Sequence, residues 1–178
     1  MFARWHDEAA LEEFLAGAGR PFANGWHVRM QYLRRWSELA ALPDLPQRAD
    51  DWDEREPAVA VTVARMRLPE VPRFLAWGKP VERLVRDHPE ATLGLAAVRP
   101  PRSISTFSVW RSIRAMTDMV HGHGDVAGMP DPTRHVDAMA ERRRRDFHRE
   151  FATFRFRPLA ERGAWNGRGD YVPWRSSL

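Results

Sequence analysis

Two histidines and four consecutive arginines share one short stretch of this chain, RHVDAMAERRRRDFHREF at residues 134–151. Imidazole nitrogens bind metal ions, and guanidinium groups bind carboxylates and phosphates. At 3.6 residues per turn, one face of a helix over this stretch carries His135, Met139, Arg142 and Asp146. A histidine at a helix start is more often a cap or a solvated side chain than a ligand. The residues alone therefore leave both interpretations open.

The other residues of this stretch have simpler interpretations. The run from Arg142 to Arg145 covers the whole circumference of a helix, so these side chains cannot all face one ligand, and part of the run is expected to be solvated. His148 falls where the helical pattern gives way to a strand, and a structural hydrogen bond is the first interpretation of its ring. The nearby HGHGD at residues 121–125 has no third histidine close behind it, which favours a helix C-cap over a metal site.

The absence of cysteine excludes disulfides, iron-sulfur clusters, thiolate ligation of iron and cysteine nucleophiles. None of the standard glycine-rich phosphate loops is present, so a flavin or nicotinamide bound through such a loop is not supported. The spacing of the residues does not define a Ser-His-Asp triad. Any chemistry therefore belongs to the histidines, carboxylates, arginines and aromatic side chains.

The formal net charge of +4 comes from 28 basic and 24 acidic residues, and Lys79 is the only lysine. This preference for arginine, amid many Ala, Pro and Gly residues, is typical of GC-rich coding rather than of selection for phosphate contacts. We therefore expect no specific binding to nucleic acid. No run reaches the roughly 20 apolar residues of a membrane span, and the first residues lack a leader pattern, which predicts a soluble protein of the cytoplasm.

The chain divides by pattern into four parts. Residues 1–39 are structured, residues 40–57 form a Pro- and Asp-rich connector, residues 58–160 carry the strongest periodicity, and residues 161–178 form an irregular tail rich in Gly and turn residues.

Periodicity within residues 58–160 predicts the order β-α-β-β-α-β. A first strand, with Val59, Val61 and Val63 on one face, precedes a helix that Gly78 and Pro80 should break into two pieces. Two strands joined by a tight RPPR link, a helix, the helix of the opening stretch and a last strand follow. The expected strands are residues 58–68, 91–98, 103–110 and 150–159. The expected helices are residues 69–89, 111–122 and 134 onward. This order defines an α+β fold with a ferredoxin-like unit.

An internal repeat adds a partial second unit in front of this one. FARWHDEAALEEFLAG at residues 2–17 aligns with FSVWRSIRAMTDMVHG at residues 107–122, and VRMQYLRRW at residues 28–36 aligns with FATFRFRPL at residues 151–159. The amino-terminal part is therefore expected to form strand, helix and strand, and a preceding half-unit is missing.

These motifs resemble the spheroidene monooxygenase family. The resemblance rests on FSVWRSIRAMTDMVHG, on RHVDAMAERRRRDFHREFATFRFRPLAERGAW, and on PRFLAWGKP and RPPRSISTFSVW, in the family's order. It covers most of residues 58–166, and the repeat extends it to residue 2. It implies a haem-containing enzyme that oxidises carotenoids, with a dimeric α+β barrel built from two ferredoxin-like units. The missing half-unit departs from that layout.

The resemblance also implies a haem b site on the helix that begins at residue 134. His135 matches the histidine ahead of the family's last helix and is the expected axial ligand of the iron, and His148 is the second candidate. The macrocycle would contact Met139, and its propionates would meet Arg142 or Arg143. The expected lining of the cavity includes three residues that would otherwise be ordinary core: Phe107, Trp110 and Met116.

We therefore expect a haem-dependent monooxygenase, or a related haem enzyme, that acts on an apolar substrate such as a carotenoid or another secondary metabolite. The alternatives are a non-catalytic barrel that binds haem or a hydrophobic molecule, and a basic interaction protein without a cofactor. The sequence does not indicate the electron donor. Because the missing half-unit would leave an apolar sheet face uncovered, a homodimer is expected. The other possible cover is the tail, through Trp165, Tyr171 and Trp174.

Overall fold

One sheet of five antiparallel strands, in the order β1-β5-β2-β4-β3, organises the molecule. The computed structural model describes residues 2–123, 131 and 133–174. The strands are β1 (His27–Trp36), β2 (Ala58–Met66), β3 (Ala91–Arg99), β4 (Ser103–Trp110) and β5 (His148–Arg162). The helices are α1 (Glu8–Ala16), α2 (Val71–Arg86), α3 (Ile113–His121) and α4 (Arg134–Arg144), with short 3-10 turns at Arg20–Phe22 (η1) and Leu68–Glu70 (η2).

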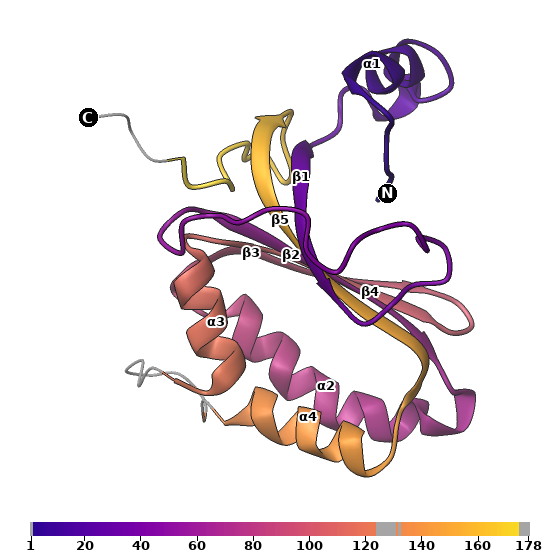
Figure 1. The fold of residues 1–178 in the computed structure, drawn as a ribbon, viewed down its shortest axis with the longest axis vertical. Coiled ribbons are helices and arrows are strands. Elements are labelled where there is room, and N and C mark those ends of the chain that lie inside the picture. Colours follow the sequence, from indigo (N-terminus) through magenta and orange to yellow (C-terminus); the bar gives the residue numbers. More distant parts are fainter. Residues whose placement is uncertain (1, 124–130, 132, 175–178) are drawn as a thin grey trace.

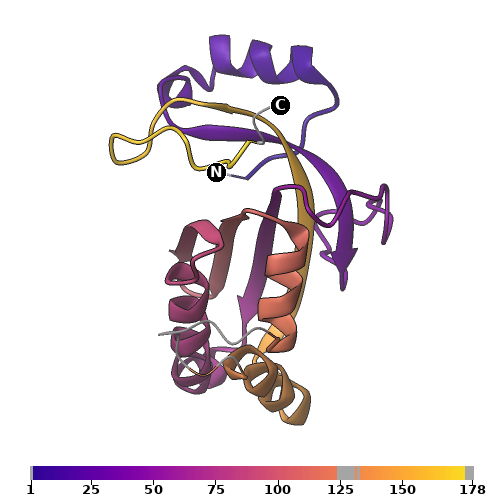
Figure 2. The same cartoon turned by 90° about the vertical axis from the view of Figure 1, so that its left-hand side faces the viewer.

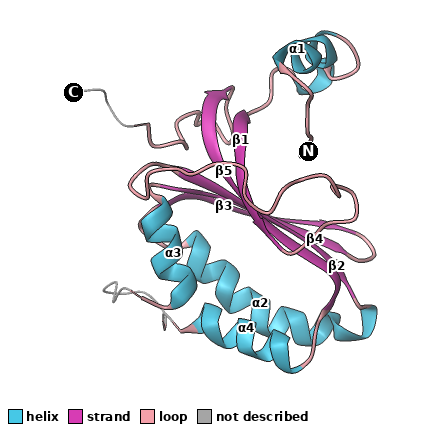
Figure 3. Cartoon of the chain, in the orientation of Figure 1, coloured by secondary structure: helices cyan, strands magenta, loops and turns pink. Residues whose placement is uncertain are grey.

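The chain from β2 to β5 has the predicted ferredoxin-like arrangement. Its four strands pair in the order β5-β2-β4-β3, and helices α2, α3 and α4 lie together on one face of the sheet (Figure 1). Figure 3 shows loops, rather than helices, over the opposite face. The predicted α+β fold class is therefore confirmed.

The amino-terminal part differs from the predicted strand, helix and strand. Strand β1 forms and pairs with β5, but residues 2–5 are not a strand. Phe2 instead packs its ring 5.6 Å from that of Phe156, on the loop-covered face of the sheet. Helix α1 follows, with the Asp7 side chain accepting a hydrogen bond from the Ala10 amide at 2.9 Å. Figure 2 shows α1 beside β1 and the far end of the long strand β5, away from the other helices.

Helix α2 is continuous, so the predicted break at Gly78 and Pro80 is wrong. The apolar side chains on either side of the proline hold both halves against the same sheet: Phe74 packs against the cluster that contains Ala64 and Met66 of β2, and Leu84 packs with Trp110 of β4. This packing keeps one helix axis in spite of the hydrogen bond that Pro80 cannot donate.

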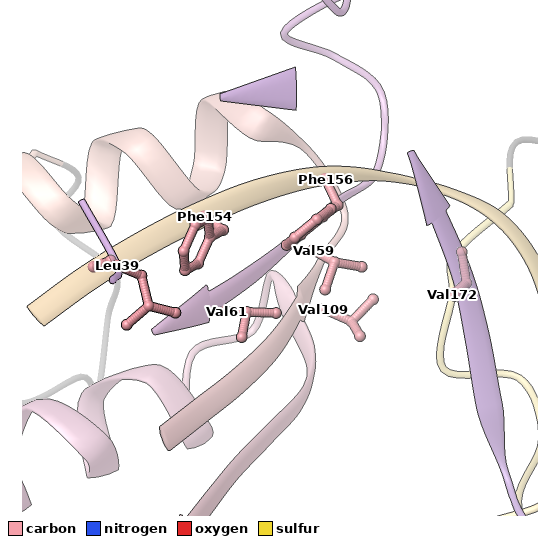
Figure 4. Close-up of a cluster of buried hydrophobic side chains, with 8 residues drawn as sticks. Leu39, Val59, Val61, Val109, Phe154, Phe156 and Val172 are labelled. Carbon is pink, nitrogen blue, oxygen red and sulfur yellow. The ribbon is translucent and has the colours of Figure 1, made fainter. Parts of the chain in front are cut away.

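The second face of the sheet is covered by the connector and the tail. Its core cluster combines residues of β2, β4 and β5 with Leu39 and Val172 (Figure 4). The full set is Leu39, Val59, Val61, Val109, Ala152, Phe154, Phe156 and Val172. Leu42 and Leu45 of the connector pack against this cluster and Val172 of the tail belongs to it, so both segments that the sequence presents as irregular contribute to the hydrophobic core.

The carboxylate of Glu161 fixes the tail to the sheet. It accepts hydrogen bonds from the backbone amides of Tyr171 and Val172 at 2.9 and 3.0 Å, and from the Trp26 indole at 2.7 Å. Tyr171 and Val172 are buried, whereas Trp165 and Trp174 remain 45% and 49% exposed. The tail does cover the sheet face, but through Tyr171 and Val172 rather than through its tryptophans. In the described part of the chain, none of the helices is both long and apolar enough to cross a membrane.

Candidate functional site

Helix α4 places three predicted cofactor residues on its half-buried side. Ala138 is 5% exposed and packs inward, and His135, Met139 and Arg142 flank it at intermediate burial. Val136, one position from His135, is 38% exposed. The i, i+4, i+7 spacing of the three residues thus selects the side of α4 that turns toward the protein.

The ring of His135 has a defined tautomer. Its Nδ1 lies 2.9 Å from the carbonyl oxygen of Val120, near the end of α3. Because a carbonyl oxygen can only accept, Nδ1 carries the proton, and the lone pair is on Nε2. Burial lowers the pKa of His135, against a smaller opposing effect of the Val120 hydrogen bond. A neutral imidazole with its lone pair on Nε2 is the form that binds a metal.

The three remaining lining residues do not share one face of the sheet. Trp110 and Met116 are 1% and 5% exposed inside a closed cluster with Leu84. Phe107 lies on the opposite face of the sheet, with its ring 5.8 Å from that of Trp26. Neighbouring strand residues alternate between faces, so Phe107 and Trp110, three positions apart on β4, point to opposite sides. Phe107 therefore cannot line a cavity beside His135, contrary to the prediction.

Three of the four consecutive arginines contact other residues of the protein. The guanidinium of Arg142 lies 3.8 Å from the centre of the Phe151 ring. Arg144 donates two hydrogen bonds of 2.7 Å to Glu141, and Arg145 pairs with Glu70. Arg143 is exposed. The run is thus partly a solvated face, as predicted, and partly a structural connection between α4 and the start of α2.

Arg73 completes that connection. It forms an ion pair with Glu70 at 2.8 Å and a second ion pair with Glu141. The side chains of Glu70 and Glu141 are 8% and 10% exposed. The hydrogen bonds from Arg144 and Arg73 lower the pKa of Glu141 to about 2. A role of Arg142 or Arg143 toward propionates remains a prediction.

His148 occupies an aromatic cage under the helices. It is 3% exposed, and its ring lies 4.9 to 5.8 Å from those of Phe74, Phe147 and Phe151. A bulge in β5 directs it there: Arg65 pairs with Glu150 and Met66 with His148, so Arg149 is the extra residue. The backbone N–H of His148 donates to Asp146 at 2.9 Å, but neither ring nitrogen has a hydrogen-bond partner.

Burial, with a smaller contribution from Arg142, lowers the pKa of His148 to about 4. The backbone N–H makes the predicted structural hydrogen bond, and Nδ1 of the ring lies 3.4 Å from the same Asp146 carboxylate, which opposes the lowering of the pKa. A macrocycle could reach this ring only by displacing the phenylalanines around it. Of the two histidines, His135 is the more accessible candidate ligand.

No group of three or more histidine or carboxylate side chains suited to a metal ion occurs within residues 2–123, 131 and 133–174. Of the HGHGD sequence, the last two residues lie outside the described residues. His121 and His123 have ring centroids 6.0 Å apart. Gly122, between them, adopts a left-handed conformation with φ 70° and caps α3, as predicted.

Comparison with known proteins yields structural likeness only. No protein-family model matches the chain, and no curated protein is similar to it. A "putative monooxygenase" from Fusobacterium nucleatum superposes with a TM-score of 0.51 at 11% identity, covering 96% of this chain and 72% of that protein.

Two further solved structures are more distant. A "putative antibiotic biosynthesis monooxygenase" from Chloroflexus aurantiacus has a TM-score of 0.39 at 17% identity, with 64% of this chain and 98% of that protein covered. An anthrone oxidase-like protein has a TM-score of 0.40 at 13% identity, with coverages of 94% and 74%. The chain thus shares the α+β fold of the Fusobacterium protein.

Proposed function

We propose that this chain is a haem-binding oxidoreductase of the monooxygenase type, with His135 as the axial ligand of the iron. The observation that carries the proposal is the hydrogen bond from Nδ1 of His135 to the Val120 carbonyl. Histidines that bind metals usually donate their second ring nitrogen to a backbone carbonyl or a carboxylate, which fixes the tautomer and orients the ring.

The residues beside His135 fit part of a haem site. Met139 offers a soft apolar contact one turn along the half-buried side of α4, and Arg142 offers a cation on the same side. A bound haem would supply the iron at which oxygen is activated. The chain's own contribution is to hold the imidazole ring through Val120 and, by burial, to keep it unprotonated.

The substrate class rests on the resemblance and not on a cavity. An apolar small molecule, such as a carotenoid or another secondary metabolite, is the proposed substrate, and an external electron donor is required. The fold shared with the Fusobacterium protein supports the monooxygenase assignment as a matter of architecture.

Visible absorption of the purified protein tests the cofactor. Protein produced with ample haem, or reconstituted with it, is expected to show a Soret band that His135→Ala abolishes or shifts strongly. His121→Ala is the matched control, because His121 lies in the last turn of α3 close to His135 but is not the proposed ligand. His148→Leu is expected to retain the band.

Three results would contradict the proposal in different ways. Protein that stays colourless after reconstitution would exclude haem binding. A band that survives His135→Ala but not His148→Leu would transfer the iron to the second histidine. A haem-loaded protein that does not oxidise an apolar substrate with reductant and oxygen would instead be a binding protein.

A further inference from the structure

A cleft rich in arginine opens at the end of the sheet where β2 leads into α2. Its lining contains four arginines and one carboxylate: Arg67, Leu68, Pro69, Glu70, Arg102, Arg145 and Arg149. Its volume is about 570 Å³, within the range of small-molecule sites. The cleft is separate from the half-buried side of α4 that carries His135, because none of its lining residues belongs to that side.

Backbone hydrogen bonds hold the arginine-bearing segments together. The amide of Met66 donates to the carbonyl of Arg102 at 2.8 Å, and the amide of Arg67 donates to the carbonyl of Phe147 at 2.9 Å. The Nε of Arg67 also donates to the carbonyl of His148 at 2.9 Å. The segments that follow β2, precede β4 and begin β5 are therefore tied to one another. A ligand would meet a fixed backbone arrangement rather than three independent loops.

The positive charge of the cleft is not balanced by its own residues. Glu70 is the one carboxylate in the lining, and its two oxygens already accept from Arg73 and Arg145. Among the described residues, the guanidinium groups of Arg102 and Arg149 have no hydrogen-bond or ion-pair partner. The terminal nitrogens of Arg67 stay available to a ligand, since the hydrogen bond from this side chain to the His148 carbonyl uses Nε alone.

Neighbouring cations in a concave site raise the local potential and attract anions. Three guanidinium groups from separate segments can surround one oxyanion, and each can donate two parallel hydrogen bonds to it. A single carboxylate would offset less of this charge than a phosphoryl group, which carries about two negative charges and three acceptor oxygens. The partly exposed side chain of Leu68 and the ring of Pro69 give the cleft an apolar wall for the rest of the molecule.

We propose that this cleft binds a small molecule that carries a phosphate or diphosphate group, held by Arg67, Arg102 and Arg149. Arg145 remains paired with Glu70. The site is independent of the haem proposal, because it shares no residue with it.

Titration calorimetry with pyrophosphate, at about 150 mM salt, tests the site. The wild-type protein is expected to bind one pyrophosphate, and the double variant Arg102→Gln/Arg149→Gln is expected to bind at least about tenfold more weakly, since two charge-assisted contacts are lost. The matched control is Arg20→Gln/Arg114→Gln, which removes the same charge from exposed positions outside the cleft. Its affinity should stay within about twofold of wild type.

The variants should fold, because the side chains of Arg102 and Arg149 make no hydrogen bonds to residues 2–123, 131 or 133–174, and thermal unfolding verifies this. The proposal is overturned if pyrophosphate at millimolar concentration does not bind, or if the control variant weakens binding as much as the cleft variant. Succinate that binds as tightly as pyrophosphate would refute the phosphoryl assignment. The Soret band of haem-loaded protein should be unaffected by either double variant, so failure of one proposal is distinguishable from failure of the other.

Discussion

Substitution of His148 by leucine should remove a large part of the protein's sensitivity to mild acid. The folded pKa of His148 is about 4, against an ordinary value of 6.5. Above pH 6.5 the ring is neutral in both the folded and unfolded states. Between pH 6.5 and about 4 the unfolded chain takes up a proton that the folded protein does not, so stability is lost as the pH falls. At 1.36 kcal/mol per pH unit, this loss reaches about 3 kcal/mol.

Leucine has a similar size and cannot be protonated, so His148→Leu should lose about 3 kcal/mol less stability than wild type between pH 7 and pH 4. At pH 7 the free energies of unfolding of the two proteins should differ by only about 1 kcal/mol. The substitution removes a buried polar ring that makes no hydrogen bonds, which is favourable, and this gain offsets the poorer packing of leucine against the phenylalanines.

Urea unfolding at a series of pH values measures these free energies. His6→Gln removes an exposed histidine and should leave the wild-type pH dependence unchanged. The charged groups nearest the ring are Arg142 and Asp146, and both remain in the variant. The reasoning is refuted if His148→Leu retains the full wild-type loss, or if nuclear magnetic resonance places the pKa of His148 near 6.5.

The remaining predictions concern α4 and the assembly. The pKa of Glu141 is lowered to about 2 from 4.5, so its ionised form stabilises the protein above pH 4.5, and this contribution is lost as the pH falls from 4.5 toward 2. Glu141→Gln should therefore lower the urea midpoint at pH 7 and flatten the acid dependence in that window; an unchanged acid transition would contradict this. Light scattering at micromolar concentration is expected to give the mass of a homodimer. A soluble monomer that becomes insoluble when residues 163–178 are removed would instead show that the tail, together with the connector, covers the sheet face of Val59 and Val61 without a second copy.

The sequence predicted the ferredoxin-like order because each element had a clear period and a clear end. Alternating valines defined β2, and the RPPR turn defined the antiparallel pair β3 and β4. The helical spacing of His135, Met139 and Arg142 also predicted which side of α4 is half-buried. These are local features, so a local pattern was enough.

The errors arose where contacts between distant segments decide the outcome. Pro80 suggested a broken helix, but packing against the sheet on both sides of it keeps α2 whole. Residue type suggested that Phe107 and Trp110 share one cavity, whereas strand alternation separates them. A stricter use of that alternation could have revealed this separation from the sequence.

The arginine cleft could not have been found by spacing. Arg67, Arg102 and Arg149 belong to three segments that only the fold brings together. The aromatic cage of His148 was equally hidden, since it depends on the bulge at Arg149, which reverses the expected side of the strand. No pattern of neighbouring residues signals such a bulge.

The position of β5 between β1 and β2 has a consequence for the synthesis of the protein. His27 pairs with Arg162 and Trp36 with Thr153, so the first strand of the sheet obtains its partner strand only when the last strand has been made. Contacts between such distant segments slow folding. On the ribosome, β1 can hydrogen-bond to the connector, as the Ala49 amide does to the Leu33 carbonyl, but the edge of β1 that pairs with β5 stays unpaired through most of translation. During that interval this edge is open to chaperones and proteases, and a chain arrested before residue 148 cannot pair it.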